Sequence, residues 1–70
     1  MDIEKQKELL RNWGFINKGD GYEWFRDPVH FNPYLIWDTN DQFGAYYHDG
    51  KLKIIRSFEE VVEIMKILIG

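Results

Sequence analysis

A β-hairpin that runs directly into a helix is the feature that most constrains this chain. Asp49-Gly50 separates two β-prone runs, residues 42–48 and 51–55. A type I′ turn needs positive φ at both central residues, which Asp tolerates and Gly adopts freely, so this dipeptide predicts a two-residue hairpin loop. Ser57 and Glu60 then have the spacing of a capping box, which predicts a helix immediately after the second strand.

The predicted turn also determines which hairpin residues share a face of the sheet. A two-residue loop places His48 opposite Lys51 and, further along, Tyr46 opposite Lys53. Side chains alternate between the faces of a strand, so the hairpin has two distinct sets. We predict that one set faces the core: Phe43, Ala45, Tyr47, Leu52 and Ile54. The other set then faces outward: Gly44, Tyr46, His48, Lys51, Lys53 and Ile55.

The first residues of the chain have the pattern of an amphipathic helix. Asp2 is a suitable N-cap, and Gly14 suits the position just after the helix, where the backbone is often left-handed. At 100° per residue, the apolar side chains of this segment fall within one arc that also contains Gln6. These apolar residues are Ile3, Leu9, Leu10 and Trp13. The pattern predicts a helix with one buried stripe.

The middle of the chain has turn and strand signals. Residues 17–21 form a turn by composition, and Tyr22 to Arg26 is a predicted strand that ends at Asp27-Pro28. Residues 29–33 are either an irregular crossing or an extension of the next strand, which runs from Tyr34 to Asp38. We therefore expect an antiparallel meander of three or four strands.

The loop between Asp38 and the hairpin leaves one orientation open. A four-residue turn from Asp38 to Asp41 directs Leu35 and Trp37 outward, with Tyr34 and Ile36 toward the core. A three-residue loop reverses this, because a shift of one residue moves every side chain to the opposite face. In either register, this strand places an aromatic and an aliphatic side chain on each face.

The last predicted helix, residues 58–69, has an unusually wide apolar arc with Ile67 outside it. Either this helix packs deeply on the sheet and leaves one isoleucine exposed, or it carries a self-association surface. The sequence thus predicts a single α+β domain over residues 1–70: a helix, three or four antiparallel strands and a second helix, with both helices on one face. The alternative has one helix on each face.

Composition narrows the function classes. The chain has no cysteine, which excludes disulfides and thiolate chemistry and favours a reducing cytoplasm. It also has no apolar run long enough to cross a membrane. A net charge of −3 argues against a general nucleic-acid binder. Aromatic residues make up 17% of the chain, more than one side of a small sheet can enclose.

The residues available for catalysis are few. Ser57 is the only serine and is explained by the helix cap. His30 and His48 are the only histidines, and they lack the spacing of a metal site. We therefore expect no enzyme activity, no metal and no cofactor.

Two classes of binding function remain. The first is an inhibitor or adaptor of the type carried by a phage or mobile element, which docks an aromatic sheet face on a partner protein or on itself as a homodimer. The second is binding of single-stranded nucleic acid by Tyr46 with Lys51 and Lys53, although those lysines also suit an ordinary edge strand. The predicted partner-binding residues are Tyr46, Trp37, Leu35, Ile55, His48, Lys51 and Lys53.

Overall fold

The computed structural model describes residues 1–26 and 33–69 of the chain. Its five strands form one antiparallel sheet in the order β1-β2-β3-β4-β5, with a helix before and a helix after them. The predicted α+β class is confirmed, with one short strand more than expected. Part of the uncertain segment 29–33 lies outside the described residues. The elements are α1 (Ile3–Asn12), β1 (Ile16–Lys18), β2 (Gly21–Trp24), β3 (Leu35–Asp38), β4 (Phe43–His48), β5 (Lys51–Ile55) and α2 (Phe58–Ile69).

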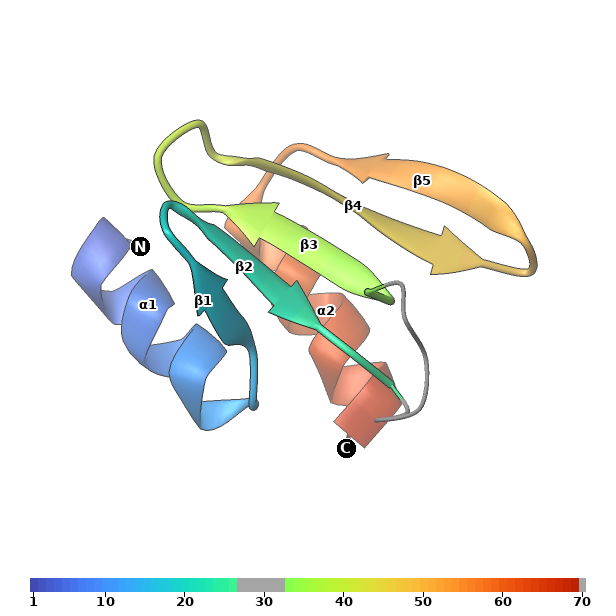
Figure 1. The fold of residues 1–70 in the computed structure, drawn as a ribbon, viewed down its shortest axis with the longest axis horizontal. Coiled ribbons are helices and arrows are strands. Elements are labelled where there is room, and N and C mark those ends of the chain that lie inside the picture. Colours follow the sequence, from blue (N-terminus) through green and yellow to red (C-terminus); the bar gives the residue numbers. More distant parts are fainter. Residues whose placement is uncertain (27–32, 70) are drawn as a thin grey trace.

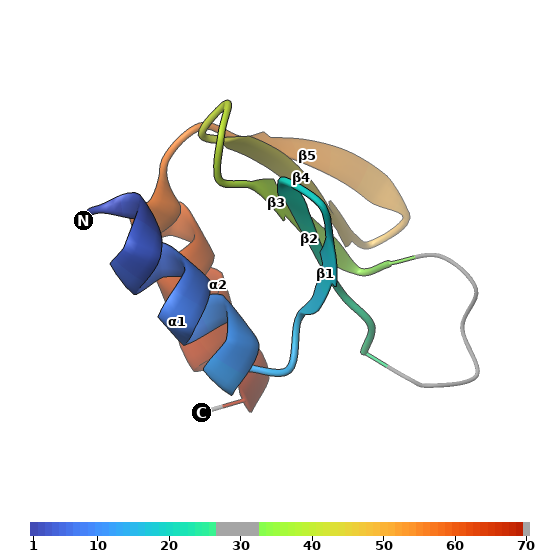
Figure 2. The same ribbon diagram turned by 60° about the vertical axis from the view of Figure 1, so that its left-hand side comes forward.

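Both helices pack against the same face of the sheet (Figure 1). Figure 2, turned by 60°, shows α1 and α2 side by side on one side of the strands, with no described element on the other. The arrangement with one helix on each face is therefore wrong. Within the described ranges, neither helix is long and apolar enough to span a bilayer.

The ends of α1 follow the sequence signals. The Asp2 carboxylate accepts a hydrogen bond from the Lys5 backbone N–H at 2.8 Å, which satisfies a donor that the helix itself cannot. At the other end, Gly14 has a φ of 94°. The N–H groups of Gly14 and Phe15 bond the carbonyls of Arg11 and Leu10, both at 3.0 Å, in the pattern of a Schellman motif. Phe15 is thereby turned back into the core.

The hairpin formed by β4 and β5 has the predicted turn and register. Asp49 and Gly50 have φ values of 52° and 75°, as a type I′ turn requires. His48 opposes Lys51 and Tyr46 opposes Lys53. A second tight turn at Gly19, with a φ of 75°, joins β1 to β2. The composition of residues 17–21 indicated this turn, but the three-residue strand before it is too short to give a periodic signal.

The loop between β3 and β4 spans residues 39–42, so Trp37 opposes Gly44 rather than Gln42. The Asp38 carboxylate accepts hydrogen bonds from the N–H groups of Asn40 and Asp41, at 2.8 and 3.0 Å, and closes the loop. The four-residue turn from Asp38 to Asp41 would have paired Trp37 with Gln42, so the observed register is shifted from that prediction by two residues. A shift of two preserves the face of every side chain. Trp37 therefore shares its face with Tyr46, and Ile36 shares the face of Ala45.

The core lies between the helices and the face that bears Trp37. The prediction that Phe43, Ala45, Tyr47, Leu52 and Ile54 face the core is wrong, because the helices cover the opposite face. The buried apolar residues are Leu10, Phe15, Tyr22, Leu35, Trp37, Ile55, Phe58, Val61 and Met65.

A small polar network is enclosed next to this core. Gln6 is 2% exposed, and its side-chain amide exchanges two hydrogen bonds with that of Gln42, at 2.9 and 2.8 Å. The Trp37 indole N–H donates to Gln6 Oε1 at 3.3 Å. Since a buried polar atom without a partner is costly, these bonds explain why a glutamine is tolerated within the apolar stripe of α1.

Candidate functional site

The predicted central binding residues lie on the helix-covered face. Leu35, Trp37 and Ile55 are fully buried in the core. Tyr46 is half-buried and packs against the same cluster. Their predicted outward orientation is therefore wrong.

The physical reason is the size of the side chains across the whole sheet. The prediction ranked the two hairpin faces, but the covered face also receives Tyr22 and Trp24 from β2 and Leu35 and Trp37 from β3. With Tyr46, the covered face of the described strands has four aromatic rings, whereas the opposite face has two, Phe43 and Tyr47. Burial of the covered face therefore removes more apolar surface from water. Gly44 adds space on this face, and the Trp37 ring fills it.

The predicted charged residues lie near the hairpin turn. Lys51 and Lys53 are exposed on β5, an edge strand of the sheet. Lys53 opposes Tyr46, so both belong to the helix-covered side of the sheet. The backbone of His48 pairs with Lys51, while the direction of its side chain lies outside the described part of the structure.

The opposite side of the sheet, which we call the open face, carries a group of exposed apolar residues. They are between 39% and 56% exposed, although each belongs to a strand. Scattered exposed apolar side chains are ordinary, whereas a contiguous group on one face marks an interaction surface. We call the group the apolar patch: Ile36, Phe43, Tyr47, Leu52 and Ile54.

The strand register makes these residues neighbours. Ile36, Ala45 and Ile54 stand opposite one another across β3, β4 and β5. Tyr47 opposes Leu52 at one end of the patch. On the other side of Ile36, the same row continues with Glu23, a charged residue on β2. The patch thus surrounds the small Ala45 side chain and is bounded by a carboxylate.

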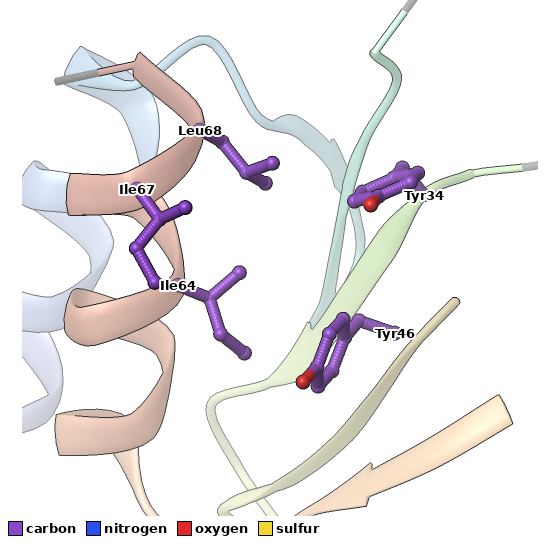
Figure 3. A pocket seen from close by; sticks show the side chains of 5 residues that line it. All are labelled: Tyr34, Tyr46, Ile64, Ile67 and Leu68. Atoms are coloured by element: carbon purple, nitrogen blue, oxygen red, sulfur yellow. The ribbon is translucent and has the colours of Figure 1, made fainter. Parts of the chain in front are cut away.

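A small pocket opens on the helix-covered side. The rings of Tyr34 and Tyr46 face Ile64, Ile67 and Leu68 of α2 across it (Figure 3). Its volume is about 110 Å³, whereas pockets for small molecules usually enclose about 300 to 1,000 Å³. The Arg26 guanidinium lies 5.5 Å from the centre of the Tyr34 ring and occupies that ring in a cation–π contact. The pocket has room for little more than one side chain.

The described residues offer no metal centre. Among them, no group of three His, Cys, Asp or Glu side chains is close enough to hold an ion. Comparison of the chain with models of protein families, with curated proteins and with solved structures found no match. The assignment of a site therefore depends on the geometry of the chain itself, and the open face is the candidate.

Sequence reasoning missed the apolar patch as a site, although one signal pointed to it. Gly44 lies inside a predicted strand, where a glycine often marks the close approach of another group. An aromatic ring on the neighbouring strand can be that group. Placing Trp37 over Gly44 would have assigned Tyr46 and Ile55 to the core and Tyr47 and Leu52 to the open face.

Tyr46 and Tyr47 provide the direct test of this face assignment. We expect Tyr47→Ala to change the free energy of unfolding by less than about 1 kcal/mol, because the side chain is 46% exposed. Tyr46→Ala should cost about 2 kcal/mol, because its ring packs against the core cluster. Urea titration of both variants measures the difference. If the order of the two losses is reversed, the assignment of the covered face is wrong.

Proposed function

We propose that this chain is a non-catalytic protein-binding domain that docks the apolar patch of its open face on another polypeptide. The single observation that carries the proposal is the contiguous set of large apolar side chains on the face that no described helix covers. Such a patch costs solubility if it stays in water, so its presence on a small acidic domain favours an interface. The absence of cysteine supports action in a reducing compartment such as the cytoplasm.

The composition of the patch suits protein recognition. Phe43 and Tyr47 supply two aromatic anchors, and Ile36 and Ile54 supply aliphatic contacts on either side of Ala45. Aromatic residues are enriched at protein interfaces, where a few buried anchor side chains contribute most of the binding energy. Inhibitors and adaptors, which act by occupying a partner, need no chemistry beyond such a surface.

Binding of single-stranded nucleic acid is less favoured by the geometry. That alternative requires the Tyr46 ring to stack on a base, whereas the ring is half-buried and faces α2 (Figure 3). Lys51 and Lys53 supply two cations to a chain with a net charge of −3. This is a weak electrostatic footprint for binding to phosphates.

A capture experiment with matched baits tests the proposed function. Three tagged baits, namely the chain, its Tyr47→Ser variant and its Ile67→Ser variant, are incubated with lysate that also contains an untagged copy of the chain. Ile67 is 83% exposed on α2, so Ile67→Ser controls for the loss of an exposed apolar side chain outside the patch. We expect the wild-type and Ile67→Ser baits to retain a protein, whether foreign or the untagged copy, that the Tyr47→Ser bait loses. Retention that is equal for all three baits contradicts the proposal.

A further inference from the structure

We propose that the apolar patch binds a second copy of this chain, sheet against sheet, around a two-fold axis that runs along β4. This inference rests on the proposed function of the open face and names its partner. Three features of the patch carry it: its area, its arrangement around Ala45, and the positions of the charges at its edges.

The area of the patch is sufficient for a dimer. Fully exposed large apolar side chains have roughly 200 Å² of accessible surface, so patch residues that are about half exposed contribute on the order of 100 Å² each. Five of them give about 500 Å² per copy, and two copies together reach the roughly 1,000 Å² that a specific interface needs. The surrounding rim adds to this.

The arrangement of the patch suits a copy of itself. The smallest side chain, Ala45, lies at the centre, with Ile36 and Ile54 beside it on the neighbouring strands. Two sheets packed face to face lie about 10 Å apart and interdigitate their side chains. An axis along β4 places Ala45 over Ala45 and packs Ile36 of each copy over Ile54 of the second. An isologous contact requires this kind of self-matching surface.

Charge selects the direction of the axis. The patch carries no charged residue, so two copies of an acidic chain meet there without repulsion. An axis across the strands would stack Glu23 of one copy on Glu23 of the second, which is unfavourable for like charges. An axis along β4 instead leaves Glu23 beyond the β5 edge of the second copy.

Sedimentation equilibrium of the full chain and two lysine variants tests the inference. We expect the wild type to dimerise at micromolar concentration. Ile54→Lys introduces one charge per copy beside the centre of the interface, over Ile36 of the second copy, and should raise the dissociation constant at least about tenfold. Ile67→Lys, on the exposed side of α2, should leave it unchanged. Circular dichroism confirms that each variant is folded, and Leu52→Lys replaces Ile54→Lys if the latter unfolds.

Crosslinking tests the axis, because the chain has no cysteine of its own. Ala45→Cys should be joined to its copy by a short bismaleimide, since the axis places the two positions in register. Lys18→Cys, on the distant strand β1, should not be joined. Linkage at Lys18→Cys without linkage at Ala45→Cys contradicts this axis.

The outcomes separate this inference from the proposed function. A monomeric wild type at tens of micromolar overturns the second-copy inference, and so does a dimer that only Ile67→Lys disrupts. A monomer that still captures a foreign protein through Tyr47 leaves the proposed function standing. Capture that ignores Tyr47, together with the absence of a dimer, overturns both.

Discussion

Gly44→Ala is expected to unfold the protein. A Cβ atom at position 44 would overlap the backbone carbonyl of Ile36 and lie 2.9 Å from Cε3 of the Trp37 ring. Neither neighbour can move freely, because Ile36 belongs to the adjoining strand and Trp37 is fully buried. We expect a loss of at least about 4 kcal/mol, which is comparable to the whole stability of a domain this small.

Gly21→Ala is the matched control for this change. Gly21 also lies in a strand, but its added methyl group would find only the Lys18 carbonyl oxygen, 3.9 Å away. The free energy of unfolding of the Gly21→Ala variant should stay within about 1 kcal/mol of the wild-type value. Thermal melts followed by circular dichroism measure both variants. If Gly44→Ala melts near the wild-type temperature, then β3 and β4 do not approach each other at Trp37 as described.

Trp37→Ala should produce the second large loss. The Trp37 ring is fully buried, meets the Phe58 ring edge-on at a centroid distance of 5.9 Å, and donates to Gln6. Replacing so large a buried ring by a methyl group leaves a cavity and costs about 3 to 5 kcal/mol. The variant should be largely unfolded at room temperature, as measured by circular dichroism and urea titration.

Trp37→Phe separates the packing of this ring from its hydrogen bond. Phenylalanine retains most of the aromatic contact but has no N–H group. Gln6 Oε1 still accepts from Gln42 Nε2 at 2.8 Å, so no buried acceptor loses its last partner. We expect a loss of about 1 to 2 kcal/mol and a folded protein. An equal loss in Trp37→Phe and Trp37→Ala would mean that the bond to Gln6, rather than burial of the ring, holds this part of the core.

The position of the candidate site follows from which face of the sheet the helices cover. A β-strand side chain belongs to one of two faces, and pairing with a neighbour determines which residues share a face. Asp49-Gly50 determined this grouping within the hairpin correctly. The choice of which of these two groups faces the core was wrong: it predicted a buried Tyr47 and an exposed Ile55, the reverse of what the structure shows.

Local signals in the sequence by themselves determined the helices, their ends and the hairpin register. Asp2, Gly14 and Asp49-Gly50 each act on backbone groups within a few residues, so their effect does not depend on the rest of the chain. Only the tertiary structure decided which face became the core. That choice depends on the combined volume of the side chains from β2, β3 and β4, and on the space at Gly44 that the Trp37 ring fills. These contributions come from separate strands, so no single segment of the sequence predicts which face is buried.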